Sequence, residues 1–92
     1  MENQPKEKKH LATITILVKD RQNSAEKINQ ILTENGHLIL ARLGVNVQRH
    51  CIENCTAIIT VAMEATNKEI REITEKIDCL YGIVAKASIM TE

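Results

Sequence analysis

The chain has 92 residues, twelve basic and twelve acidic side chains, and a formal net charge of zero. This length suits one domain with a modest core and leaves little room for a deep active-site cleft. The balanced charge provides no basic field for nucleic acid, and a single tyrosine without Phe or Trp provides no stacking platform for single-stranded bases. Composition therefore gives no support for direct nucleic-acid binding, and the core must be aliphatic.

The chain also has no sign of a membrane or secretory segment. No apolar run approaches the ~20 residues of a membrane span, and the polar start MENQPKEKKH has no hydrophobic signal region. Three cysteines, an odd number, do not make a disulfide framework. We expect a cytoplasmic protein without membrane contact, with residues 1–9 as a disordered lead and residues 10–92 as one domain.

The first half of the chain predicts a strand followed by a helix. Residues 10–18, HLATITILV, alternate with a period of two and are rich in β-branched side chains. Residues 23–35 have apolar side chains at helical spacing. Asn23 or Ser24 is expected to cap this helix, and Gly36 to end it in the left-handed conformation.

A strand over residues 38–47 completes the first half, and the second half predicts a strand, a helix and a last strand over residues 56–64, 67–78 and 83–90. Thr66 and Glu69 have the spacing of a capping box at the start of the helix. The order strand–helix–strand, repeated once, has one well-known compact solution. It is the ferredoxin-like βαββαβ sandwich of class α+β, a four-stranded antiparallel sheet with both helices on one face and the first and third strands central.

The sheet face without helices is predicted to be an interface between copies of the chain. Such a face is polar when it meets water, but here aliphatic side chains are mixed with the polar ones. The expected contact residues are Leu17, Leu38, Leu40, Arg42, Ile58 and Thr60. We expect self-association as a dimer or tetramer, through this face or by pairing of the outer strands.

Four segments together resemble the ACT-like regulatory domains. They are TITILVKDR at residues 13–21, NSAEKINQIL at 23–32, ILARLGV at 39–45 and IDCLYGIVAKAS at 77–88. More narrowly, they resemble the family of small proteins named as iron-only hydrogenase system regulators, which is related to the C-terminal domain of the nickel-responsive repressor. The resemblance implies an ACT-like fold and a regulator of transcription or of hydrogenase assembly.

Two departures limit what the resemblance implies about sites. Amino-acid-binding ACT domains have a glycine in the turn after the first strand, whereas this turn has none and matches only at Asp20 and Arg21. The nickel repressor has a pair of histidines where this chain has Gly44 and Asn46, and only Cys55 matches its cysteine. The resemblance therefore does not extend to a nickel site.

The turn Asp20, Arg21, Gln22 and Asn23 is nevertheless a candidate ligand site. It follows the first strand and precedes a helix N-terminus, where exposed amides attract anions. A small anionic or amino-acid-like effector would lie between this turn and a neighbouring subunit. The alternative is that Asp20 merely caps the turn.

A second candidate site is the cluster His50, Cys51 and Cys55 on the connection between the second and third strands. Thiolate and imidazole suit soft or borderline metals, but a fourth ligand is missing unless a subunit mate supplies one, for example His37. The alternatives are a redox-sensing disulfide between the two cysteines, or two ordinary cysteines. Cys79 is expected to be a buried small apolar residue. The sequence identifies no cofactor.

No arrangement of carboxylates, serines or glycine-rich loops suits catalysis, so we expect no enzyme. Three functions stay open. The first is a homo-oligomeric regulatory module that senses a small molecule. The second is a metal or redox sensor built on the cysteine cluster, and the third is a structural accessory protein without a ligand.

Overall fold

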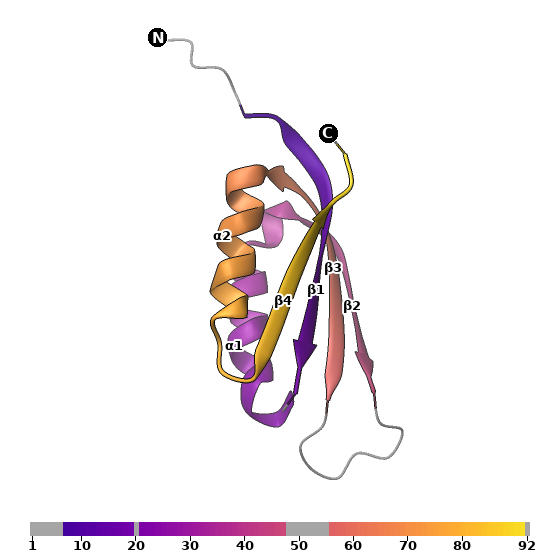
Figure 1. Ribbon diagram of the computed structural model, residues 1–92, viewed down its shortest axis with the longest axis vertical. Coiled ribbons are helices and arrows are strands. Elements are labelled where there is room, and N and C mark those ends of the chain that lie inside the picture. Colours follow the sequence, from indigo (N-terminus) through magenta and orange to yellow (C-terminus); the bar gives the residue numbers. More distant parts are fainter. Residues whose placement is uncertain (1–6, 20, 48–55, 92) are drawn as a thin grey trace.

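The computed structural model describes residues 7–19, 21–47 and 56–91, except for the side chains of residues 21–23. Its elements in chain order are β1 (Lys9–Val18), α1 (Arg21–Glu34), the 3-10 turn η1 (Gly36–Leu38), β2 (Ile39–Asn46), β3 (Ala57–Thr66), α2 (Asn67–Asp78) and β4 (Ile83–Ile89). The strands form one antiparallel sheet in the order β2-β3-β1-β4. Figure 1 shows both helices on the same side of that sheet. The predicted ferredoxin-like sandwich is confirmed.

The core lies between the sheet and the two helices, where the alternation in β1 and β3 predicts it. Every second residue of β1 from Ala12 to Val18 is buried, and β3 contributes Ala57, Val61 and Met63. The helices add Ile28 and Leu32 from α1 and Ile70, Ile73 and Ile77 from α2. Among the described residues, no helix is both long and apolar enough to cross a bilayer.

The ends of α2 match the sequence, whereas those of α1 do not. At α2, the Oγ1 of Thr66 accepts from the N–H of Glu69 at 3.2 Å, and the N–H of Thr66 donates to Glu69 Oε1 at 2.9 Å. This is the predicted capping box. Helix α1 begins at Arg21, so Asn23 and Ser24 lie in its first turn and the expectation that either caps it is wrong.

Helix α1 also ends differently from the prediction. Gly36 opens η1, and Gly82 is the glycine with positive φ (75°) in the described part of the chain. A left-handed residue is unnecessary after α1 because Asn35 satisfies the helix end itself. Its side-chain Nδ2 donates to the carbonyl of Ile31 at 2.8 Å, and its backbone N–H reaches the carbonyls of Ile31 and Leu32.

Strand β2 departs most from the predicted alternation. Ile39 pairs with Met63 while Ala41 pairs with Ala62, so the register shifts between the two β2 residues. An extra residue in one strand moves every following side chain to the opposite face. The face assigned to the rest of β2 from a strict period of two is therefore wrong.

Two predicted open-face residues lie elsewhere as a result. Arg42 pairs with the buried Val61 and donates a hydrogen bond to Asn29 of α1, so it lies on the helix side. Leu38 belongs to η1 rather than to the strand, and it is buried in the core. Their expected placement on the face without helices is wrong.

Candidate functional site

The sheet side without helices, here called the open face, has an apolar row across all four strands. Strand pairing places Val45 opposite Ile58, Ile58 opposite Leu17, and Leu17 opposite Val84. We call these four residues the apolar row. Val45 is 52% exposed, Ile58 39% and Val84 37%, while Leu17 is half-buried between its neighbours. An aliphatic side chain in each strand at the same level makes a continuous strip that burial against another surface would stabilise.

The open face becomes more polar away from the apolar row. The next row consists of Leu43, Thr60, Thr15 and Lys86, and the one after it of Ala41, Ala62, Thr13 and Ser88. Leu11 and Met90, which are 45% and 67% exposed, lie at the far end of the sheet. The apolar row lies at the end nearest the connection between β2 and β3, with these two mostly polar rows beside it. A partner surface would need an apolar strip at that end and a polar area beside it.

The predicted interface residues have different places in the structure. Leu17, Ile58 and Thr60 lie on the open face, and Leu40, at the register shift, is 62% exposed. The structure adds three aliphatic residues that the sequence reading missed, Leu43, Val45 and Val84. The two from β2 were assigned to the opposite face because periodicity alone cannot locate an irregularity in a strand. That any of these residues touches another copy stays a prediction.

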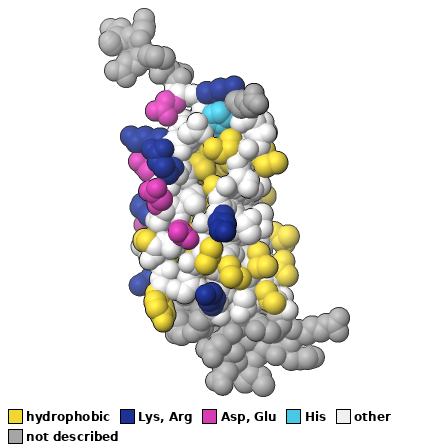
Figure 2. Space-filling model, viewed as in Figure 1, with side chains coloured by type: hydrophobic (Ala, Val, Ile, Leu, Met, Phe, Trp, Pro, Cys, Tyr) yellow, Lys and Arg dark blue, Asp and Glu magenta, His cyan; other side chains and the backbone are white. Residues whose placement is uncertain are grey.

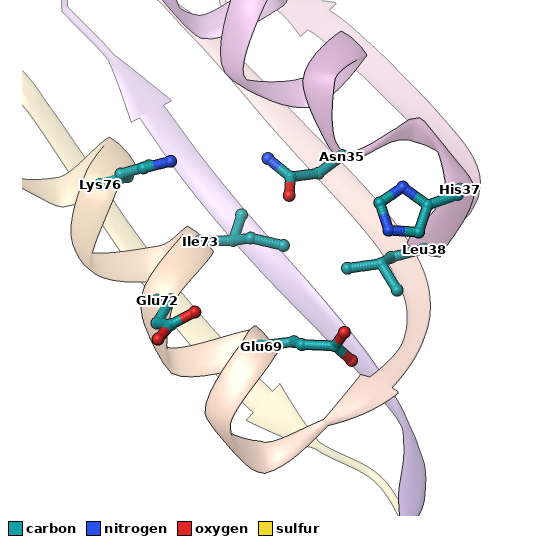
Figure 3. A pocket seen from close by; sticks show the side chains of 7 residues that line it. All are labelled: Asn35, His37, Leu38, Glu69, Glu72, Ile73 and Lys76. Atoms are coloured by element: carbon teal, nitrogen blue, oxygen red, sulfur yellow. The ribbon is translucent and has the colours of Figure 1, made fainter.

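A small pocket with both signs of charge lies between η1 and α2 (Figure 3). It measures about 180 Å³ and is lined by Asn35, His37, Leu38, Glu69, Glu72, Ile73 and Lys76. We call it the mixed-charge pocket. Glu69, Glu72 and Lys76 lie on one side of α2 because residues three and four apart share a helix face. An apolar base with acidic and basic groups around it suits a small polar molecule that carries both charges.

From the sequence, His37 was interpreted either as a surface histidine or as a metal ligand supplied to another subunit, and not as part of a pocket. His37 is exposed, as expected for a surface residue. Asn35 and Leu38 are its neighbours in the chain, whereas Glu69, Glu72, Ile73 and Lys76 come from α2, more than thirty positions further along. The spacing of Glu69, Glu72 and Lys76 is a weak signal by itself, because solvent-facing helix sides commonly show it.

Most residues of the other predicted sites lie outside the residues that the structure describes. Asp20 lies outside the described residues, and of Arg21, Gln22 and Asn23 only the backbone, in the first turn of α1, is described. His50, Cys51 and Cys55 also lie outside the described residues. Both sites therefore stay predictions. Within residues 7–19, 21–47 and 56–91, no group of three His, Cys, Asp or Glu side chains could hold a metal.

Cys79 lies on the surface rather than in the core. It follows the last residue of α2 as the C-cap, and its exposed thiol donates to the carbonyl of Lys76 at 3.2 Å. The expectation that it is buried is wrong. The buried stripe of α2 ends at Ile77, two positions before Cys79.

Comparison with known proteins agrees with the residue-level resemblance. A family model described as "TM1266-like: Iron-only hydrogenase system regulator, putative" matches residues 10–87. Among solved structures, that of the uncharacterized protein TM1266 from Thermotoga maritima is similar, with a TM-score of 0.81 and 27% sequence identity. The similarity covers 91% of this chain and 100% of that chain. No curated protein gave a significant match.

Proposed function

The chain belongs to the TM1266-like family, and on that premise we propose that it is a non-catalytic regulator of an iron-only hydrogenase system that works as a homo-oligomer. The family description supplies the regulatory role and the hydrogenase system. The structure supplies the reason for self-association.

The apolar row is the observation that carries the homo-oligomer. In an isolated protomer, three of its four side chains leave more than a third of their surface in water. Burying apolar surface is favourable by roughly 25 cal/mol per Å². Two copies related by a two-fold axis along this row would cover each other's aliphatic strip with the same residues, which is the contact that symmetric dimers use.

The proposed regulatory step is a ligand-driven change in how the copies pack. A small molecule shifts such an equilibrium only if it binds the two packings with different affinity. The mixed-charge pocket offers one place for a small polar effector, and the predicted turn at residues 20–23, at a subunit boundary, is another. A thermal-shift screen of amino acids, small carboxylates and amines would report binding as a raised unfolding temperature.

Light scattering of the purified protein tests the assembly. We expect a mass above that of a monomer at ~100 μM, where contacts of micromolar affinity are occupied. The variant Ile58→Lys should lower that mass, because it places a charge in the middle of the apolar row. Thr33→Lys, at an exposed position of α1, is the matched control and should leave the mass unchanged. A wild-type monomer at this concentration would rule out the homo-oligomer.

A genetic experiment tests the role. Removing the gene from its host should change the transcript level or the activity of the iron-only hydrogenase. Wild-type protein and Thr33→Lys should restore the original level, and Ile58→Lys should restore it poorly. Unchanged hydrogenase transcript and activity after removal would contradict the regulatory role, whatever the assembly of the purified protein.

A further inference from the structure

Strand β4 forms one edge of the sheet, and the direction of its backbone groups can be read from two hydrogen bonds. The N–H of Met90 donates to the carbonyl of Leu11 at 2.8 Å, and the carbonyl of Gly82 accepts from the N–H of Lys19 at 3.2 Å. Even-numbered residues of β4 thus direct their backbone groups toward β1. In an antiparallel pair the residues between them direct theirs to the other side, away from the sheet.

The chain closes only the first half of that outer edge. The N–H of Ile83 donates to a carbonyl of the preceding turn at 3.2 Å, and the N–H of Ala85 donates to Asp78 Oδ1 at 2.8 Å. The N–H groups of Ala87 and Ile89 have no hydrogen-bond partner among the described residues. We call the segment from Ala87 to Ile89 the open edge, and it is a template on which another strand can pair.

A groove lies along this open edge. It is formed by α2 and β4, measures about 510 Å³, and is lined by Asn67, Ile70, Arg71, Thr74, Glu75, Ala87 and Ile89. Ile89 is on the helix side, since it pairs with Ala12, yet it is 49% exposed. Figure 2 shows hydrophobic side chains at the surface, between the charged side chains of α2 on one side and the sheet on the other. Free backbone groups and uncovered apolar surface thus coincide at one place.

We propose that the occupant is β4 of a second copy, paired antiparallel about a two-fold axis at Ala87, which joins the two four-stranded sheets into one. In this register the N–H of Ala87 donates to the carbonyl of the partner's Ala87. The N–H of Ile89 donates to the carbonyl of the partner's Ala85. Both free donors are used, and the hydrogen bond from Ala85 to Asp78 is kept.

The side chains of β4 fit the same register. Ile89 lies opposite Ala85 of the partner subunit, so a large apolar side chain meets a small one. On the open face, Lys86 lies opposite Ser88 of the partner subunit rather than opposite its own copy. A register two residues earlier would centre on Ala85 and compete with Asp78, and one two residues later would leave few residues to pair.

The charges that line the groove are also complementary in this arrangement. The bond between Asp78 and Ala85 sets these residues level, and Ala87 lies about 6.6 Å further along the strand at ~3.3 Å per residue. In a helix the same distance corresponds to about four to five residues at ~1.5 Å each. Counted back along α2 from Asp78, this places Ala87 level with a point between Arg71 and Glu75. Because a two-fold axis there makes the two α2 helices antiparallel, each Arg71 faces the partner's Glu75.

This contact rests on the proposed homo-oligomer and adds a second two-fold interface to it. Open-face contact alone makes a dimer, and so does edge pairing alone. Both together close a tetramer where the two two-fold axes cross at right angles, and they build a longer open assembly where the axes do not cross. The edge contact can be isolated in the Ile58→Lys background, in which the open-face contact is weakened.

Sedimentation of charge-swapped variants in that background tests the proposal. Arg71→Glu places acid against acid and Glu75→Arg places base against base, so each should raise the dimer dissociation constant about tenfold or more. The double swap should restore the dimer. An equimolar mixture of the two single variants should also form a dimer, because the acidic replacement at position 71 of one chain can then face the basic replacement at position 75 of the other. A dimer held together by surfaces other than the β4 edge would not be restored by the double swap or by mixing the two single variants.

A backbone variant tests the strand pairing itself. Ala87→Pro removes an N–H that faces away from β1, so the protomer keeps its own ladder, but the new edge pairing loses its central donor. We expect a folded monomer by circular dichroism and sedimentation. The proposal is overturned if Ile58→Lys alone is already monomeric at ~100 μM, or if neither charge reversal nor proline changes the dimer. Hydrogenase control that persists in either case would leave the proposed function standing.

Discussion

Asp78 determines how much of the β4 edge is available, through a single hydrogen bond. It is the last residue of α2, and its Oδ1 accepts from the N–H of Ala85 at 2.8 Å. Without that carboxylate the N–H of Ala85 would be another unpaired edge donor, next to Ala87 and Ile89. One acidic side chain therefore ties helix to strand and shortens the segment on which a foreign strand could pair.

Asp78→Ala should destabilise the protein by about 1–2 kcal/mol, because a part-buried N–H loses its acceptor. Asp78→Asn keeps an oxygen in the same place and should cost less than half as much. Urea unfolding measures both free energies. Equal stability of the alanine variant and the wild type would show that water replaces the carboxylate without cost.

Thr66→Ala should cost about 1 kcal/mol, because the side chain is the cap of α2 and accepts from the N–H of Glu69. Thr66→Ser retains the hydroxyl and should stay within about 0.5 kcal/mol of wild type. Thermal unfolding monitored by circular dichroism compares the two. An alanine variant as stable as the serine variant would mean that the reciprocal bond from Thr66 N–H to Glu69 is sufficient alone.

At the scale of elements, β2 is the strand that the rest of the fold constrains least. All of its residues after Ile39 are exposed, so neither face is fixed by burial. Register is strongly specified only where one face is buried, and an irregularity near the start of β2 is therefore tolerated. That irregularity places Leu43 and Val45 on the open face and thereby completes the apolar row.

A pair of leucine variants separates the observed arrangement from simple alternation. Leu38→Ala should destabilise the protein by about 2–4 kcal/mol, since Leu38 is 8% exposed and packs in the core. Leu40→Ala, at 62% exposure, should stay within about 0.5 kcal/mol. Strict alternation would predict similar effects for both residues. Equal losses in urea unfolding would contradict the 3-10 turn at Leu38.

At the scale of the whole molecule, the two ends of the described domain meet at the sheet. The Nδ1 of His10 donates to the carbonyl of Thr91 at 2.8 Å, and the N–H of Leu11 donates to Thr91 Oγ1 at 2.9 Å. These contacts join the start of β1, a central strand, to the residues that follow β4. The beginning of the fold is therefore fixed by long-range pairing rather than by local sequence.

Shortened chains test this boundary. Removing residues 1–8 should leave the unfolding temperature within about 2 °C of wild type, because no described core residue is lost. Removing residues 1–11 also deletes His10 and Leu11 and should lower it by several degrees. A large loss from the shorter deletion would mean that the domain begins before residue 10.

The local pattern of the sequence determined the elements, their order and most of the core. Strands β1 and β3 alternate clearly because one of their faces is buried, and α2 has both an apolar stripe and a capping box. With βαββαβ order, few compact topologies remain, so the central placement of β1 and β3 followed from the sequence as well. The family resemblance rested instead on residues 13–21, 23–32, 39–45 and 77–88.

The tertiary structure determined the features that depend on contacts between helices and strands. The side of β2, the burial of Leu38, the exposure of Cys79 and the closing of half an edge by Asp78 depend on residues far apart in the chain. Local periodicity holds no information about them, because each results from one element packing against another. The mixed-charge pocket, the apolar row and the open edge became visible only when the sheet and both helices were in place.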